Sequence, residues 1–383
     1  MLDRMVRGRV PTSPHAVFRD PEGALLHEHC LTRSGFDGPY TIAYHRHPPH
    51  HVRPAEVDHG WRTPRAVSGR RLDRRHYRSD RVGVGGPAVD CRVPLLFNDD
   101  VTLSVMSPDA PDPVWFADAD ADHLVFVRQG GGVLHTPLGA LPMSEHDYVF
   151  VPRGLAHRFV PDGGSQHWFD IACTGGVGIP EDWRNSAGQL RMDAPYSHRD
   201  FRRPSLAPHG GELRELLVRR NGDFHGFSYL HDPLDVVGWD GTVYPWALSI
   251  HRFRPRVASV HLPPTAHGTF AARGALICSF VPRMVDFGQG AIPCPYPHSS
   301  FDIDEVLLYV AGDFTSRTTV GPGSLSHHPA GVPHGPHPGA YEGSIGAERT
   351  DELAVMLDCA RPLHATAAAL EVEDGSYSGS FLG

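Results

Sequence analysis

Two pairs of matching segments constrain the fold of this chain more than any other feature. The segment HLVFVRQG, which begins at His123, resembles EVLLYVAG, which begins at Glu305. The segment PRGLAH, which ends at His157, resembles PAGVPH, which ends at His334. Each first segment is an apolar, β-branched run typical of a strand, and each second segment is a turn rich in glycine and proline. The repetition predicts two copies of one β-rich unit.

Short strands separated by tight turns are expected throughout. Apolar runs such as VPLLF, VTLSVM, DYVFV and HWFDIAC recur at close intervals between residues 93 and 173, and the chain holds 41 glycines and 36 prolines. Such spacing is typical of a β-sandwich or barrel. Two segments have apolar residues at helical spacing instead, and we expect helices over residues 211–220 and 350–370, the latter packed on the second barrel.

A candidate metal site lies within residues 295–337. Glu305 follows His298 by seven residues and opens an apolar strand, and His334 follows a turn rich in glycine and proline. Two imidazoles and one carboxylate from neighbouring strands can occupy one face of a divalent metal and leave the other face open. This arrangement suits Fe(II) oxygenases, which need free positions for dioxygen and substrate. The alternative is that these residues are ordinary polar side chains of turns.

The first copy lacks this ligand set. Phe116 stands where His298 stands, and His123 stands where Glu305 stands, which leaves His157 without a carboxylate partner. We therefore expect a degenerate, metal-free barrel in an N-terminal domain of residues 1–240. A C-terminal domain of residues 241–383 is expected to hold the catalytic barrel.

Composition and charge exclude several classes of function. A net charge of -9 argues against nucleic acid or an anionic membrane as the main partner. The six cysteines have no CxxC spacing, which favours reduced thiols, and neither a leader peptide nor a membrane-length apolar run is found. We expect a soluble, cytoplasmic protein. The histidines between His45 and His51 lie among prolines without a carboxylate at strand spacing, so a loop or a subunit contact is favoured there over a metal site.

Several longer motifs point to one family. The stretches GWDGTVYPW, HLPPTAH, YPHSSFDIDEVLLYVAGDF and SLSHHPAGVPHGPHPG resemble the homogentisate 1,2-dioxygenase family in its shorter bacterial form. The resemblance implies a mainly β, duplicated cupin (jelly-roll barrel) architecture with the metal in the second cupin and a short C-terminal helix. It also implies Fe(II), O2 and a small aromatic substrate. The implied reaction opens the ring of homogentisate to maleylacetoacetate in tyrosine and phenylalanine catabolism, within a homo-oligomer (a trimer or hexamer).

The resemblance also assigns roles to single residues. The family's iron ligands fall on His298, Glu305 and His334, and its acid-base histidine falls on His261. A further pocket histidine falls on His328, which is expected to act in catalysis and to contact the substrate. The implied substrate contacts are His334, His328 and Phe314. The roles of His327 and His337 are left open, as are the residues that would hold the substrate's carboxylate.

Two departures from the family pattern leave alternatives open. The family's carboxylate follows its first histidine by six residues, a position that Asp304 occupies here, but Glu305 is chosen because it opens the apolar strand. Phe314 stands where the family has a substrate-contacting tyrosine, and it has no hydroxyl. A dioxygenase for a different hydroquinone therefore remains an alternative. So do a zinc or manganese cupin that catalyses an isomerisation or a hydrolysis, and a metal-free ligand-binding protein.

Overall fold

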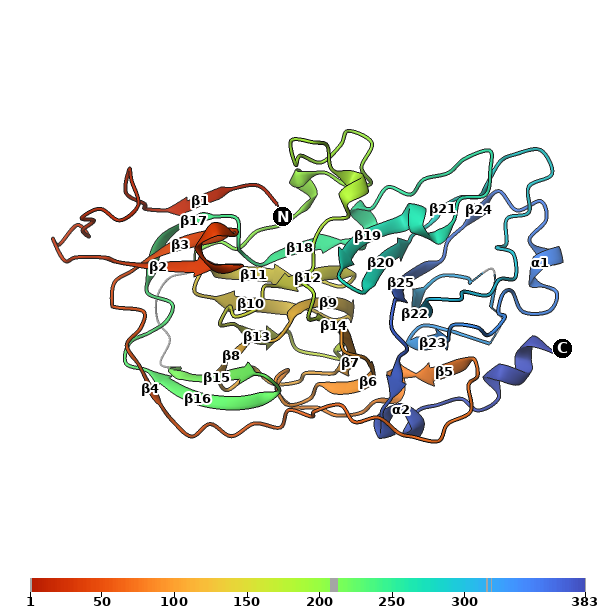
Figure 1. The fold of residues 1–383 in the computed structure, drawn as a ribbon, viewed down its shortest axis with the longest axis horizontal. Helices are drawn as coiled ribbons and strands as arrows, with labels where there is room; N and C mark the ends of the chain where they lie inside the picture. Colours follow the sequence, from red (N-terminus) through yellow and green to blue (C-terminus); the bar gives the residue numbers. More distant parts are fainter. Residues whose placement is uncertain (1, 207–212, 315, 318, 383) are drawn as a thin grey trace.

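The structure is a computed structural model that describes residues 2–206, 213–314, 316–317 and 319–382. Figure 1 shows two β-rich halves side by side, with the first copy of the repeat in one and the second copy in the other. Each half contains a large antiparallel sheet with buried, apolar inward faces. This confirms the predicted mainly β architecture of two barrels with a short C-terminal helix.

The first barrel is built on a seven-stranded sheet. Its order is β18 (Trp246–Ser249), β12 (Asp147–Val151), β9 (Asp122–Gln129), β14 (His167–Cys173), β7 (Val101–Met106), β6 (Val93–Phe97) and β26 (His364–Ala365). A three-stranded sheet has the order β11 (Gly139–Met143), β10 (Gly132–Thr136) and β13 (Arg158–Pro161). Val125 and Phe126, which adjoin one another in β9, are both fully buried, so both faces of that strand are packed.

The second barrel is built on a six-stranded sheet. Its order is β19 (Gly268–Ala272), β20 (Ala275–Phe280), β25 (Leu353–Cys359), β22 (Asp304–Ala311), β23 (Ser324–His328) and β5 (Arg75–Arg78). A two-stranded sheet, β21 (Arg283–Met284) with β24 (Arg349–Thr350), accompanies it. Starting from β5, the strands of this sheet correspond one by one to those of the first barrel starting from β18. In this correspondence β22 takes the place of β9 and β25 takes the place of β14.

The two barrels exchange their edge strands. Strand β18 directly precedes the second barrel in the chain but pairs with β12 of the first. Strand β5 precedes the first barrel but pairs with β23 of the second. Strand β26, from the end of the chain, pairs with β6. The division at residue 240 stays a prediction, and strand pairing crosses it in both directions.

Two four-stranded sheets, two short α-helices and several short 3₁₀ helices complete the described fold. One sheet has the order β1 (Met5–Gly8), β17 (Val236–Gly241), β3 (Tyr40–His45) and β2 (His27–Thr32). The other has the order β4 (Val52–Pro54), β16 (Asp223–Tyr229), β15 (Glu215–Arg220) and β8 (Trp115–Asp118). The α-helices are α1 (Ala340–Gly343) and α2 (Ala367–Glu371), and the Thr366 side chain caps α2 by accepting from the Ala369 amide.

The predicted C-terminal helix is wrong in extent, and the helix predicted over residues 211–220 is wrong in kind. Leu353–Cys359 is a central strand of the second barrel, and the C-terminal helix covers only Ala367–Glu371. Glu215–Arg220 is likewise a strand, although residues 211–212 lie outside the described part of the chain. A short run that is apolar on both faces fits a buried strand as well as a helix, and only its pairing partners decide between them.

Candidate active site

The first residues of β22 and two loops bring His298, Glu305 and His334 together. One ligand atom from each residue lies within 4.8 Å of the other two. Glu305 Oε2 lies 3.8 Å from His298 Nε2, and Glu305 Oε1 lies 3.6 Å from His334 Nε2. Glu305 opens the strand as its second residue, while His298 and His334 face one another across an isolated antiparallel bridge. The predicted triad therefore converges on one point.

Both imidazoles are held in the tautomer that a metal requires. The Nδ1–H of His334 donates to the carbonyl of Val332 at 3.1 Å, and that of His298 donates to the carbonyl of Tyr296 at 3.3 Å. The Nε2 lone pair of each ring is thereby directed toward Glu305. His334 Nε2 is buried and has no hydrogen-bond partner within the described residues. A backbone carbonyl behind each ligating imidazole is the usual support in metal sites, so this donor set fits a divalent metal.

Asp304, the neighbour of Glu305, faces away from this point. Its carboxylate accepts from the backbone amides of Ala330 and Leu363, both at 2.9 Å, and from His327 Nε2 at 3.0 Å. Successive residues of a strand point to opposite faces, so only one of the two carboxylates can reach the triad. The geometry supports the choice of Glu305.

The first barrel provides an independent comparison for Asp304. Asp122 opens β9 as Asp304 opens β22, and its carboxylate accepts from the amides of Arg153 and Val177 at 2.7 and 2.8 Å. These two amides occupy the same places in the repeat as those of Ala330 and Leu363. Both aspartates therefore fix a loop and the chain after a neighbouring strand, and this role belongs to the fold rather than to a metal.

Glu305 is ionised and firmly positioned. Burial alone would raise its pKa, but the hydrogen bond from His328 and the nearby imidazoles of His298 and His334 hold the pKa well below its usual range. The Nδ1–H of His328 donates to Glu305 Oε1 at 2.7 Å, and its Nε2 accepts from the Tyr377 hydroxyl at 3.0 Å. Burial lowers the pKa of His328 to about 3, so the ring is neutral. This chain of hydrogen bonds fixes the carboxylate.

The contacts of His328 differ from those expected of a substrate-binding residue. It is fully buried with both ring nitrogens engaged, and it does not line the cavity beside the triad. A direct role for His328 in catalysis or substrate contact stays a prediction, and its described contacts make it a positioning partner of Glu305. His327 contacts Asp304, and His337 contacts Ser380 and Phe381, so neither belongs to the triad.

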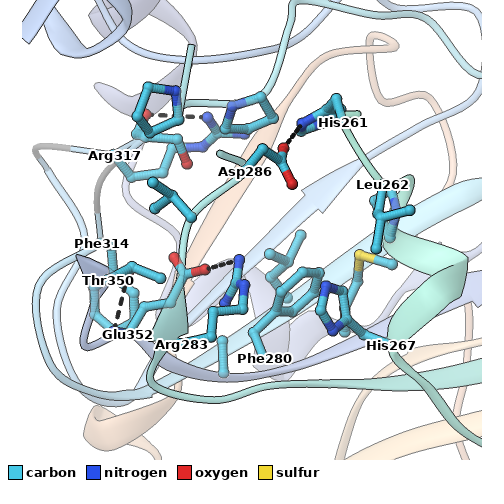
Figure 2. A pocket seen from close by; sticks show the side chains of 18 of the residues that line it. His261, Leu262, His267, Phe280, Arg283, Asp286, Phe314, Arg317, Thr350 and Glu352 are labelled. Carbon is cyan, nitrogen blue, oxygen red and sulfur yellow. Dashed lines mark hydrogen bonds and ion pairs between the residues drawn. The ribbon is translucent and has the colours of Figure 1, made fainter. Parts of the chain in front are cut away.

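A cavity opens beside the triad. His298, Glu305, His261 and Phe314 are among its lining residues, which places four of the predicted site residues around one space. His261 Nδ1 lies 2.6 Å from Asp286 Oδ2, and its side chain is 30% exposed. Figure 2 shows His261 and Asp286 facing one another at the edge of this cavity. Phe314 packs edge-on against Tyr309 with ring centroids 4.7 Å apart.

Several cavity residues were not predicted. Arg317 is buried and lines the cavity, and its Nε has no hydrogen-bond partner in the described part of the chain. His267, the last residue of HLPPTAH, is also buried with Nδ1 unpartnered among the described residues. Asp358 does not line the cavity but lies opposite Glu305 in the β22–β25 pairing, and burial together with the charge of Glu305 raises its pKa to about 7. The only sequence signal for Asp358 was its polarity within the apolar run LAVMLDC.

The equivalent place in the first barrel holds an ion cluster. Phe116 and His157 form the same backbone bridge as His298 and His334, and the Nδ1–H of His157 likewise donates to the carbonyl two residues before it. His123 lies between Asp118 and Asp170, each at 2.9 Å. Burial opposes its charge, but Asp170 and Asp118 raise its pKa to about 9. The sequence did not predict the two carboxylates of this cluster, Asp118 and Asp170, and both bind His123.

Comparisons with known proteins identify the family. A protein from Saccharolobus solfataricus described as a "putative dioxygenase" is 30% identical over 378 residues, covering 97% of both chains. A family model described as the N-terminal part of homogentisate 1,2-dioxygenase matches residues 109–250. The chain belongs to the homogentisate 1,2-dioxygenase family. Membership supports an oxygenase activity.

Relatives named for the activity itself are more distant. Homogentisate 1,2-dioxygenases from Emericella nidulans and Rhizobium etli are each 26% identical to this chain. The alignments cover 54% and 60% of the lengths of these two relatives. Among solved structures, a cupin 2 conserved barrel protein from Leptotrichia buccalis is 9% identical with a TM-score of 0.34, covering 75% of this chain and 96% of that one. In the described part of this chain, no helix is long and apolar enough to cross a membrane.

Proposed function

We propose that this protein is an Fe(II)-dependent ring-cleaving dioxygenase that converts homogentisate to maleylacetoacetate in tyrosine and phenylalanine catabolism. The observation that carries the proposal is the convergence of His298, Glu305 and His334 beside a cavity, with both imidazole Nε2 lone pairs directed at one carboxylate. Two imidazoles and a carboxylate on one side of the site leave the cavity side open for dioxygen and substrate.

Iron(II) held by this triad would supply the open coordination positions that dioxygen chemistry requires. The other functions fall to side chains of the chain itself. His328 and Tyr377 hold the Glu305 carboxylate in place through the two hydrogen bonds described above. His261 takes the proton from the phenol of the substrate, because its Nδ1–H is held by Asp286 and its Nε2 is left as the acceptor.

Arg317 is the proposed partner of the substrate's carboxylate. It is a buried cation that lines the cavity; its Nη1 donates to the carbonyls of Ser316 and Gly335, and its Nε has no hydrogen-bond partner among the described residues. A planar guanidinium suits bidentate binding of a carboxylate. Replacing Arg317 with methionine is therefore expected to weaken homogentisate binding but not the binding of a hydroquinone that lacks the carboxylate. Equal weakening of both would remove Arg317 from this role.

A second candidate substrate is a different hydroquinone-type aromatic. Phe314 favours it, because its ring offers no hydroxyl and packs on Tyr309 at the cavity wall. Losing one hydrogen bond to a buried polar group costs about 1–3 kcal/mol, enough to change the preferred substrate. Buried His267, with its unpartnered Nδ1 in the same cavity, offers a polar contact elsewhere in the pocket.

An oxygen-uptake experiment separates these candidates. Protein reconstituted with Fe(II) is supplied with homogentisate, with 2,5-dihydroxybenzoate or with a hydroquinone lacking a carboxylate. The dioxygen is isotopically labelled, and mass spectrometry measures how many labelled oxygen atoms each product contains. We expect uptake with homogentisate and both labelled atoms in a ring-opened product. Uptake only with another hydroquinone would favour the second candidate, and substrate conversion without uptake would indicate a non-oxidative metal-dependent cupin.

We also propose that the active species is a homo-oligomer, a trimer or hexamer, and that it works in the cytoplasm. Light scattering on the purified, iron-loaded protein tests the assembly, and a monomer at working concentration would contradict it. The assignment of catalysis to residues 241–383 and of a metal-free cupin to residues 1–240 belongs to the same proposal. Iron analysis of a variant that lacks the second-barrel triad tests that assignment, because no iron should remain in the first cupin.

A further inference from the structure

A second histidine-rich cavity lies far from the triad in the sequence. Its imidazoles come from β2, from β3, from the loop after β3 and from the segment after β16, and together they define what we call the histidine cavity. They are His29, His45, His47, His51 and His231. The cavity also borders Leu155 and Ala156, from the loop that follows β12 in the first barrel. The proposed dioxygenase chemistry uses none of these residues.

The carboxylate that the sequence did not reveal comes from just before β17. Asp235 Oδ1 lies 2.6 Å from His45 Nδ1, and Asp235 Oδ2 lies 3.0 Å from His47 Nδ1. One buried carboxylate thus accepts the Nδ1–H of two imidazoles and leaves both Nε2 lone pairs free. Carboxylate–imidazole pairs of this kind orient histidines that bind metals.

His45 presents its lone pair in a buried position. The residue is 4% exposed, it lines the cavity, and its Nε2 has no hydrogen-bond partner within the described residues. Leaving a buried polar atom unpaired costs about 1–3 kcal/mol, which a ligand that accepts the lone pair would recover. The pairing of β2 with β3 sets His27 opposite His45, so His29, two residues on, lies on the same face of the sheet.

The distance between His29 and His45 suits a shared ion. Their ring centroids are 5.4 Å apart. With metal–nitrogen bonds of about 2.0–2.1 Å, two imidazoles on one tetrahedral ion have centroids about 5 Å apart.

The charge of the cavity selects a cation. Two aspartates, Asp232 and Asp235, line it, and no arginine does among the described residues. Imidazole nitrogens favour zinc, copper, nickel and iron over calcium or magnesium, which prefer oxygen ligands. The candidate third donor is His47, whose Nδ1–H donates to Asp235 like that of His45 and whose side chain is 48% exposed.

We propose that the histidine cavity binds one divalent transition-metal ion of the zinc class through His29, His45 and His47, with Asp235 as the supporting carboxylate. Among the described residues, only the His298 triad brings three ligand atoms within 4.8 Å of one another. Binding in the histidine cavity therefore includes rotation of the exposed His47 ring toward the His29–His45 pair. The site is independent of the dioxygenase centre.

Zinc binding by the full-length Glu305→Ala protein tests the proposal, because that substitution removes the catalytic ligand set. Metal-stripped protein is dialysed against Zn²⁺ and its zinc content is measured. We expect one zinc ion per chain and a higher melting temperature with zinc. Adding His29→Gln or His47→Gln should abolish both effects, whereas adding His225→Gln, on the exposed face of β16, should change neither. Adding Asp235→Asn should weaken zinc binding about 10- to 100-fold.

Two results would overturn the proposal. One is the absence of bound zinc in the Glu305→Ala protein. The other is equal zinc loss in the His29→Gln and His225→Gln versions, which would assign the metal to scattered surface histidines. Circular dichroism of each variant confirms that lost zinc does not reflect lost fold. Neither result bears on the dioxygenase proposal, because the triad is already inactivated in every protein compared.

Discussion

His298 and His334 are joined by a reciprocal pair of backbone hydrogen bonds, 2.8 Å from His298 N to His334 O and 2.9 Å in the other direction. Phe116 and His157 are joined in the same way in the first barrel, with both distances at 2.8 Å. The backbone scaffold of the candidate centre is therefore a property of the repeated fold. The side chains placed on that scaffold decide whether a metal can be bound.

This equivalence predicts the effect of His298→Phe, which copies the first barrel into the second. We expect the variant to lose its iron and its oxygen uptake while its melting temperature stays close to that of the wild type. Iron analysis together with thermal unfolding measures both effects. Retention of iron at wild-type level would show that His298 is not a ligand. A large loss of stability would show that the two bridges are not interchangeable.

Asp304 and Glu305 should respond to substitution in opposite ways. Glu305→Ala is expected to abolish iron binding and activity with little loss of stability. Asp304→Ala removes the acceptor of two backbone amides, and each unsatisfied buried group costs about 1–3 kcal/mol, so it should lower stability while iron per folded chain persists. Iron content and denaturant unfolding of the two variants test this. If Asp304→Ala strips the metal from folded protein, the strand register described here is wrong.

His261→Phe separates substrate binding from chemistry. If His261 is the general base, turnover per bound iron should fall about 10²- to 10⁴-fold, with iron content and substrate affinity retained. The loss should shrink at high pH, where the phenol ionises unaided. Asp286→Asn should give a smaller loss in the same direction, because it weakens only the support of the ring. Wild-type turnover per iron in His261→Phe would remove this histidine from the mechanism.

The ion cluster in the first barrel makes stability depend on pH. The pKa of His123 is raised from 6.5 in the unfolded chain to about 9 in the fold. A raised pKa means that the stabilisation is fully present below pH 6.5 and is lost as pH rises through 9. Each tenfold change in proton affinity is worth about 1.4 kcal/mol, so the loss amounts to at most about 3.5 kcal/mol.

Denaturant unfolding across this pH range measures the effect. The groups that face His123 are Asp118, Asp170, His157 and the guanidinium of Arg92, and Arg219 binds Asp118 from the other side. Replacing His123 with glutamine should remove the decline between pH 6.5 and 9, whereas the exposed His225→Gln should retain it. An unchanged pH profile in His123→Gln would assign the decline to other groups.

The sequence predicted the duplication because the matching segments carry their strand and turn signals locally. The triad was predicted for the same reason, since each ligand lies beside a strand end within 37 residues of the others. The predictions failed where long-range pairing decides. LAVMLDC is a strand because β20 and β22 flank it. Asp235 lies 190 residues from His45, so no local spacing could reveal it. The exchange of β5 and β18 was equally hidden from local patterns.

Oxygen uptake per bound iron tests most directly whether His298, Glu305 and His334 form an iron-dependent dioxygenase centre. Wild-type protein and Glu305→Ala are reconstituted with Fe(II) without oxygen, freed of unbound metal and supplied with homogentisate and dioxygen. We expect about one iron per wild-type chain, with uptake proportional to that iron and one dioxygen consumed per substrate opened. For Glu305→Ala we expect neither iron in the second barrel nor uptake. Equal uptake by the two proteins, or iron-loaded wild-type protein that consumes no dioxygen with any hydroquinone, would contradict this expectation.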